Sequence, residues 1–585
     1  MTVTAGTIDG GSGLTNTDAA SKKVGFRTLN HYPNFGVRTG MLLLVVVSSI
    51  VLWYQYYVPT SVAPLLLPHF HMSFTYYVTL IIIANIAGVI AALAGGLADK
   101  VGRANIVVGG LLVVAVVQTF VLPNASSKFM LGVGLALVGL FEGVVLVATP
   151  ALVRDFTPQL GRASAMGFWT LGPVAGVLTA SLVGTHTLSA TSTDWQREFL
   201  ISGIAGFAVF VLSAVLLKEL SPRLRDQLMV SLRDRELVEL KAKGLDIEKA
   251  TQNPWGQMFK FEILASALAV SVMLIIFYTA SGFYPVYIST SFHQGLANVQ
   301  PFTLSQANGI DTWIWAADCL ALVIFGVLSD LAKVRKPFML IGALGALSMM
   351  VVSIGITGNE STGYYEIVGV NVALFAFLGM AYSTWMASFT ETVEARNPAL
   401  VATGLAIWGA LLRAVVALSL LALPHVVSSA GPIVDNQSYL QYAPKVLNIE
   451  AKDGPLVKIV QDNQALFTKL SSYKNQSDIP LPLILQAVKA AGSISTLEKI
   501  NAIKPDLEYL QTYGPPLLKL QSEANSAPHQ WQNWFWICFG GILIFIPLIF
   551  LMKGRWNPAA AKRDEDEHEQ FVQSELVRLR GASTV

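Results

Sequence analysis

The sequence predicts an all-α integral membrane protein with twelve transmembrane helices in two pseudo-symmetric six-helix bundles, and a helical extracytoplasmic insertion before the last helix. Three observations predict this class. Of the 585 residues, 53% are hydrophobic and only 13% are charged, whereas soluble domains carry roughly 25% charged residues. The apolar residues come in runs of about 20, the length that crosses a bilayer core. The basic residues gather on one side of these runs.

The first bundle is expected at 40–218, after a polar tail at 1–39 that lacks the short apolar region of a cleaved signal peptide. In hydrocarbon every backbone amide needs a partner within the protein, so uninterrupted apolar runs of this length must be helices. We place the first six spans near 40–64, 73–97, 105–122, 129–152, 164–184 and 198–218.

A linker at 219–261 separates the two bundles. Leucines recur every four residues from Leu220 to Leu232 with arginines around them, which predicts an amphipathic helix on the cytoplasmic face. The first five helices of the second bundle follow within 262–423. Their spans lie near 262–289, 309–331, 337–357, 365–389 and 400–423.

The insertion at 424–531 mixes short apolar periodicities with polar residues and prolines. We expect a small, mostly helical extracytoplasmic cap, which without cysteine staples would depend on the membrane domain for stability. The twelfth transmembrane helix is expected at 532–552, and a charged cytoplasmic C-terminal tail at 553–585.

The distribution of basic residues predicts the orientation. The short loops on the outer side hold only Lys128 and Arg197, whereas nine basic residues lie in 218–260 alone. By the positive-inside rule, both termini are cytoplasmic. The expected location is the cell (plasma or inner) membrane, with the lipid bilayer as the surrounding partner.

Several function classes find no support in the sequence. The two cysteines, Cys319 and Cys538, lie inside predicted spans and offer neither a disulfide framework nor metal-ligand spacing. A phosphate-binding Gly-x-x-x-x-Gly-Lys-Ser/Thr loop is absent. We find no convincing nucleophile–base set, so an enzyme, a cofactor, a metal and a nucleic-acid partner are not expected.

A glycine-rich motif follows the second span. A Gly, a Leu and an Asp stand at every second position, followed by a basic residue, a Gly and a second basic residue. These are Gly95, Leu97, Asp99, Lys100, Gly102 and Arg103. Glycine permits close helix approach and tight turns, and a carboxylate such as Asp99 suits a helix N-terminus.

This pattern resembles the signature of the major facilitator superfamily between its second and third helices. The resemblance covers the twelve spans and implies secondary transport. In that family the motif's Asp and Arg lock the two bundles on the cytoplasmic side, with an acidic partner at the end of the fourth helix. Asp155 fits that place; the alternative is that these charges merely set topology.

The second half holds a looser copy of the motif, with Asp330 and Arg335 after span 8 but without the glycine. Glu394 after span 10 is the expected counterpart of Asp155. Spans 5 and 11 also repeat each other, as halves of such transporters do around a midplane site. Span 5 contains Gly172-Pro173, similar to a motif of drug/proton antiporters in this superfamily, although glycines equally serve helix packing.

Three ionisable residues lie near mid-span, where charges are costly and functional by default. Glu142 in span 4 is a candidate proton carrier, because desolvation disfavours the charged form of a buried carboxylate; a structural hydrogen bond is the alternative. Arg413 in span 11 offers a planar fork for a carboxylate. Arg413 could equally form an internal ion pair with Asp318 in span 8, and both readings stay open.

Aromatic residues beside polar ones, including Trp169 in span 5 and Tyr56 in span 1, are expected to line the substrate cavity. These observations together predict proton-coupled uptake (symport) of a small organic anion. Two alternatives remain. One is a proton-coupled exporter of drugs or metabolites, and the other is a membrane receptor or assembly protein that uses the cap.

Overall fold

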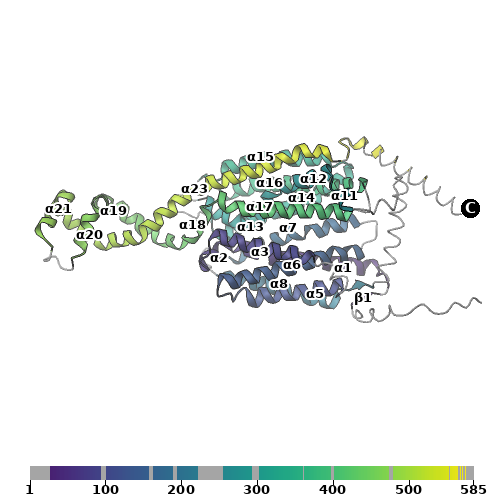
Figure 1. Ribbon diagram of the computed structural model, residues 1–585, viewed down its shortest axis with the longest axis horizontal. Helices are drawn as coiled ribbons and strands as arrows, with labels where there is room; N and C mark the ends of the chain where they lie inside the picture. Colours follow the sequence, from purple (N-terminus) through teal and green to yellow (C-terminus); the bar gives the residue numbers. More distant parts are fainter. Residues whose placement is uncertain are drawn as a thin grey trace, which may run out of the picture.

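A computed structural model shows an elongated helical bundle that carries a helical cap at one end (Figure 1). The structure describes residues 27–29, 31–93, 101–156, 162–188, 194–221, 254–292, 302–359, 361–396, 401–473, 479–552 and a few positions between 554 and 574. All structural statements below concern these residues.

Eleven helices in the described residues are long and apolar enough to cross a membrane, and α7 is a further long helix among them. The first six spans are α1 (Phe35–Ser61), α3 (Phe74–Leu93), α5 (Arg103–Val116) with the π-helical η2 (Val117–Val121), α6 (Lys128–Phe156), α7 (Arg162–Thr187) and α8 (Trp195–Leu216). The second six are α12 (Phe261–Met273) with α13 (Ile275–Ser291), α14 (Leu304–Ala332), α15 (Lys336–Ile356), α16 (Tyr364–Arg396), α17 (Val401–Val426) and α23 (Lys504–Leu548). This is the twelve-helix architecture that the apolar runs predict.

Three details differ from simple uninterrupted spans. The seventh span divides at Leu274 into α12 and α13. A short helix, α2 (Ala63–His69), follows α1, and η6 (Ile549–Leu551) ends the twelfth span. The amphipathic helix expected in the linker falls mainly at 222–253, outside the described residues, and only the short α11 (Pro254–Met258) is seen there.

A two-residue parallel ladder ties the N-terminal segment to the end of the first bundle. β1 (Thr28–Leu29) pairs with β2 (Glu219–Leu220), which follows α8. Both strands and α11 lie at the end of the bundle opposite the cap (Figure 1). We call these two ends the cap side and the tail side.

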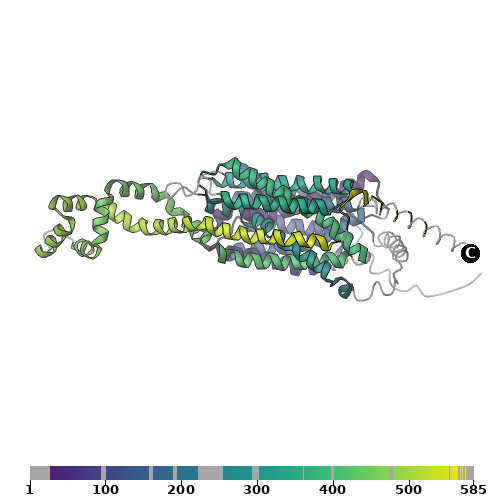
Figure 2. The ribbon, with the colours of Figure 1, turned by 90° about the horizontal axis from the view of Figure 1, so that it is seen from above.

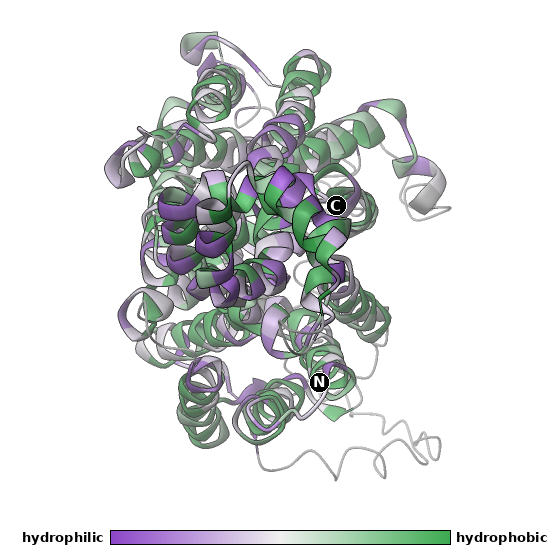
Figure 3. Ribbon diagram, turned by 90° about the vertical axis from the view of Figure 1, so that its left-hand side faces the viewer, coloured by the Kyte–Doolittle hydropathy of each residue, from purple (hydrophilic) through white to green (hydrophobic). Residues whose placement is uncertain are grey.

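The cap consists of short helices arranged around the first part of α23. They are α18 (Ala430–Asp435), η4 (Gln437–Tyr442), α19 (Ala443–Asp462), α20 (Gln464–Ser471), α21 (Leu481–Ala491) and α22 (Ile494–Ala502). A core formed by residues such as Val446, Ile449, Leu517 and Leu520 holds α19 against α23. Seen from the cap end, hydrophilic residues gather on the cap, while the bundle behind it is mostly hydrophobic (Figure 3).

The cap and the twelfth span share one helix. α23 runs for 45 residues without interruption through positions 531 and 532, where the sequence suggests a change from cap to membrane (Figure 2). Within the bundle it packs against α12, α13 and α15. The cap is therefore built directly onto the second bundle.

The base of the cap also touches the first bundle. α18 packs against α2 and α3 on one side and against α13 and α23 on the other. Gly431 in α18 lies so close to α3 that a Cβ there would sit 3.2 Å from the Cβ of Phe74. Ser429 fixes this base to α23, because its hydroxyl donates to Glu523 at 2.7 Å and its amide donates to Gln530 at 2.9 Å. The cap base thus bridges both bundles.

Candidate functional site

A cavity of about 410 Å³ lies between the two bundles, midway along the helices. Its walls come mainly from α1, α3 and α6 of the first bundle and from α13 and α17 of the second. Most of the lining side chains are aliphatic or aromatic, and Glu142 and Arg413 are the charged groups among them. Concave, mostly apolar sites with a few placed polar groups are typical of small-molecule binding.

Glu142 projects into this cavity from α6, at a place where α6 crosses α3 very closely. A Cβ on Gly139 or Gly143 would collide with the backbone of Ala84 or Gly88 on α3. These glycines let the two backbones meet, as small residues do in membrane helix pairs. Glu142 is only 6% exposed, and its Oε1 atom has no hydrogen-bond partner within the described part of the chain.

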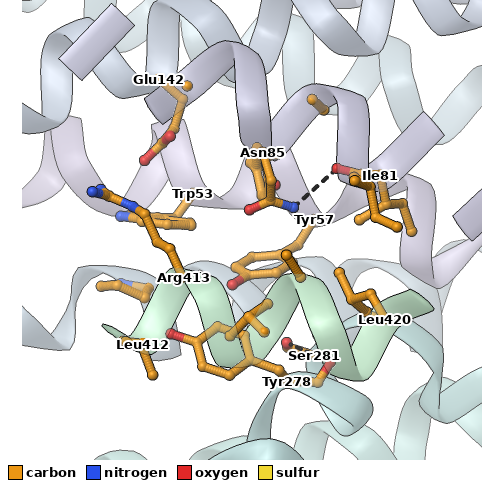
Figure 4. Close-up of a pocket in the computed structure, with 18 of the residues that line it drawn as sticks. Trp53, Tyr57, Ile81, Asn85, Glu142, Tyr278, Ser281, Leu412, Arg413 and Leu420 are labelled. Atoms are coloured by element: carbon orange, nitrogen blue, oxygen red, sulfur yellow. Dashed lines mark hydrogen bonds between the residues drawn. The ribbon is translucent and has the colours of Figure 1, made fainter. Parts of the chain in front are cut away.

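Arg413 faces Glu142 from α17 on the other side of the cavity, and both side chains point into the same space (Figure 4). Among the described residues, no hydrogen bond or ion pair with N···O within 4.0 Å joins Arg413 to a protein group. A guanidinium keeps its charge at any physiological pH. The cavity therefore presents a permanent positive charge at mid-membrane depth, and Glu142 is the acidic group that faces it.

Aromatic side chains surround these two groups. Trp53 stacks on Tyr57 with ring centroids 5.5 Å apart, and Tyr56 meets Trp53 edge to face at 5.5 Å. Trp53 and Trp408 both line the cavity, and the Nε1 atom of each is buried without a hydrogen-bond partner among the described residues. Two tryptophan side chains and one guanidinium thus line one space, and the guanidinium suits an anionic ligand.

Two further residues predicted for the substrate site are placed differently. Asp318 does not line the cavity but is buried between α14 and α16, where its Oδ1 lies 2.6 Å from the position of a Cβ on Gly379. No ion pair joins Asp318 to Arg413 in the described part of the chain. The Asp318 side chain instead points toward Gly379 on α16. The side chain of Trp169 lies outside the described residues, although its neighbour Thr170 lines the cavity.

On the tail side, the predicted pair of Arg103 and Asp155 is in contact. Nη1 of Arg103 at the start of α5 lies 2.9 Å from Oδ1 of Asp155 near the end of α6. Gly102 has φ = 101°, a conformation that glycine tolerates and side chains do not. Gly95 and Asp99 lie outside the described residues.

Glu219 completes this cluster. Its buried carboxylate accepts a hydrogen bond from the backbone N–H of Arg103 at 2.8 Å, at the N-terminus of α5. A negative charge is stabilised there by the unpaired amides and the helix dipole. Glu219 lies in β2, so the two-residue ladder also positions the residue that accepts a hydrogen bond at the N-terminus of α5.

The second-bundle copy centres on Arg335. Its guanidinium lies 2.5 Å from Asp330 and 3.0 Å from Glu391, and it also donates to the hydroxyl of Ser329 at 2.7 Å. The acidic partner on α16 is Glu391, one turn before the expected Glu394, whose side chain is not described. Both halves therefore pair a basic residue near one helix end with an acidic residue near the end of another helix.

Hydrogen bonds join the bundles on the cap side. The hydroxyl of Ser181 on α7 donates to Asp311 on α14 at 2.5 Å, and Ser305 donates to the carbonyl of Thr185 at 2.6 Å. Asn308 on α14 donates to the carbonyl of Ser61 on α1 at 3.1 Å. We call this group the cap-side seal.

Sequence reasoning did not single out several cavity residues. Trp53, Asn85, Tyr278 and Ser281 all line the space around Glu142 and Arg413 (Figure 4). Asn85 carries an amide in the middle of an apolar span, which is a signal that a search for polar as well as charged residues would find. Within the described residues, no group of three or more His, Cys, Asp or Glu side chains could hold a metal ion.

Comparisons with known proteins agree with this architecture. A family profile described as "Major Facilitator Superfamily" matches residues 42–420. The quinolone resistance protein NorB of Staphylococcus aureus (strain JH9) is 25% identical over 163 residues, which cover 28% of this chain and only 35% of that relative.

Two solved structures share the fold at low sequence identity. One is a bacterial homologue of the human lysosomal transporter Spinster, in an inward-facing and unoccupied conformation, with a TM-score of 0.53 and 15% identity, covering 90% of this chain and 100% of that chain. The other is a D-xylose–proton symporter, with a TM-score of 0.51 and 14% identity, covering 67% of this chain and 90% of that chain.

Proposed function

The chain belongs to the Major Facilitator Superfamily, and from this premise we propose that it carries a small organic anion into the cell together with a proton. Members of this family are transporters, and this multi-pass membrane protein is a secondary transporter. The anion and the proton are the new parts of the proposal. The proposal also places the protein in the plasma membrane, with both termini in the cytoplasm and the cap outside the cell.

One observation carries the proposal: Glu142 and Arg413 face each other across one cavity without being paired. Arg413 is exposed to the cavity, and a bound anion would pair with its charge. The guanidinium of Arg413, with its planar fork of N–H donors, would hold a carboxylate at two points.

The same arrangement gives a reason for coupling. In the empty site, the nearest negative charge available to Arg413 is that of Glu142. An incoming anion takes over this role, and two negative charges in a small desolvated space repel each other. Uptake of a proton by Glu142 removes the repulsion, so anion and proton bind together and leave together.

The alternating access that moves them would use both ends of the bundle. The cap-side seal closes one end in this structure. We propose that the clusters around Arg103 and Arg335, which tie neighbouring helices within each bundle, form the gate at the other end, together with the motif residues Gly95 and Asp99. Repeated halves that rock around a midplane site are the general plan of such transporters.

Proteoliposomes that contain the purified protein test the proposal. Uptake of a panel of labelled organic acids is measured with and without an inward proton gradient, for wild type, Glu142→Gln and Arg413→Ala. We expect gradient-driven uptake of at least one acid by wild type, gradient-independent exchange with Glu142→Gln, and no uptake with Arg413→Ala. Asp318→Asn is the matched control, because it removes a buried carboxylate outside the cavity and should leave coupling intact.

Two results would contradict the proposal. If wild type moves no acid under any gradient, the organic-anion function fails. If Asp318→Asn uncouples transport and Glu142→Gln does not, the proton carrier is Asp318 and the role of the cavity pair is structural.

Export of drugs or metabolites is a second candidate, favoured by the match to a quinolone resistance protein over 28% of this chain and by Gly172-Pro173 in α7. The direction of flux discriminates between the two. Export would be favoured if a drug accumulates inside inverted vesicles under an outward proton gradient, the opposite of the gradient that drives uptake.

A further inference from the structure

The substrate cavity is displaced toward one of the two seams between the bundles. α3 and α17 contribute the largest share of its lining, whereas no residue of α14 lines it. The cap-side seal joins α14 to α7 and α1. Within the described residues of α3 and α17, no hydrogen bond crosses from one helix to the other. The α3–α17 seam is therefore held by apolar contact alone.

The cavity lining at this seam includes one residue of an exposed stripe on α3. Ile83, Ile86 and Ile90 form an i, i+3, i+7 stripe on α3 and are 45%, 50% and 62% exposed. An exposed apolar stripe on a transmembrane helix faces lipid. Ile86 belongs to this stripe and also lines the cavity. The lining is thus continuous with the lipid-facing surface.

The polar and apolar parts of the cavity are arranged in order along α17. Arg413 lies on the same face as Val416 and Leu420, three and seven residues later, and all three line the cavity. Ile81 and Ile86 line it from α3. A compact anionic group at Arg413 would leave an aliphatic wall beside it that a fully hydrophilic substrate could not use.

We propose that the substrate is an amphiphile, namely an organic anion with one charged head group and an extended alkyl or aryl body, which enters from the bilayer between α3 and α17. This inference rests on the proposed function, because it uses Arg413 as the anion site. The head group occupies the space between Glu142 and Arg413, and the body lies along Val416, Leu420 and Ile86. Each methylene group buried against this wall should strengthen binding about fourfold, equivalent to about 0.8 kcal/mol.

Binding of butane-, hexane- and octanesulfonate to the protein in lipid nanodiscs tests the proposal, with empty nanodiscs used to correct for partition into lipid. Sulfonates stay charged, so passive flux of a protonated form does not interfere. We expect the dissociation constant to fall roughly sixteenfold with each two-carbon step, and binding of all three ligands to be lost in Arg413→Ala.

Two tryptophan variants on one helix separate the lining from its surroundings. Ile86→Trp places a bulky ring at the seam and should remove most of the preference for octanesulfonate, while butanesulfonate still binds. Ile90→Trp is the matched control, because Ile90 lies on the same stripe but does not line the cavity, and it should leave the series unchanged.

The outcomes distinguish this inference from the proposed function. If all three sulfonates bind equally and depend on Arg413, the small-anion function stands and the amphiphile inference is overturned. The inference also fails if Ile86→Trp and Ile90→Trp behave alike, or if octanesulfonate binds equally well without Arg413. If no sulfonate binds and no organic acid moves in proteoliposomes, the proposed function itself fails.

Discussion

Replacing Ser181 by alanine tests the seal that closes the bundles on the cap side. In the structure this hydroxyl donates to the buried carboxyl group of Asp311, which is 1% exposed. When the bundles separate on this side, water replaces the hydroxyl, so the bond stabilises only the closed state. Leaving a buried acceptor without its partner costs roughly 1–3 kcal/mol. A central value of about 2 kcal/mol shifts the equilibrium about thirtyfold toward the state that is open on the cap side.

Spin labels on the two bundles measure this shift. Thr75 at the start of α3 and Glu366 at the start of α16 are exposed on the cap side and suit labelling after the two native cysteines are replaced. Pulsed dipolar spectroscopy should show a new, longer distance in Ser181→Ala. Thr179→Val is the control, because among the described residues that hydroxyl donates only to the carbonyl of Ala175 in its own helix. The reasoning is refuted if Ser181→Ala keeps the wild-type distances, or if Thr179→Val changes them equally.

Three further predictions concern packing, pH and the cap. Gly143→Val should destabilise the protein by roughly 1–3 kcal/mol, because a Cβ there collides with the backbone of α3; thermal unfolding in detergent should show a lower Tm, whereas Gly109→Ala, with open space around its Cβ, should not. Partial desolvation, opposed by the charge of nearby His71, raises the pKa of Asp435 to about 6, so docking of α18 should be strongest at acid pH and weaken as the pH rises from the ordinary aspartate value to about 6. Hydrogen exchange of 430–435, corrected for intrinsic rates, should therefore be slower at pH 5 than at pH 7.5 in wild type and show no such difference in Asp435→Asn. Paired cysteines at Gly431 and Phe74, whose Cβ atoms would lie 3.2 Å apart, are close to disulfide geometry; oxidation should stop transport and reductant should restore it, while Gly431→Cys alone should be insensitive to both.

The sequence was sufficient for the spans and for the two charges of the site. Apolar runs must be helices in hydrocarbon, so their number follows from hydropathy. Glu142 and Arg413 stood out because mid-membrane charges are rare, and the structure places both at one cavity.

Depth along a helix does not reveal the direction of a side chain. The sequence places Asp318 at a depth similar to that of Arg413, but its side chain points toward Gly379 on α16 rather than into the cavity. Among the described residues Arg335 pairs with Glu391 on α16, and the side chain of the predicted Glu394 lies outside them.

Two other features had no usable signal. The β1–β2 ladder has two residues per strand, too few for any periodicity. The prolines of the insertion suggested interruptions, because proline in a helix interior costs about 3 kcal/mol. α23 nevertheless continues through Pro515, Pro516 and Pro528, and the burial of Leu517 and Leu520 against α19 helps to offset that penalty.

The continuity of α23 turns the cap into a lever arm. At 1.5 Å per residue, the part of this helix between Lys504 and Trp531 extends roughly 40 Å beyond the bundle. A rotation of the second bundle by about 15°, comparable to known subunit rotations, would sweep the far end of the cap through about 10 Å. A displacement of a few ångströms at the substrate is thereby amplified outside the membrane. A fluorophore on the cap would report each transport cycle. A molecule that binds the cap and restricts its motion would slow the cycle.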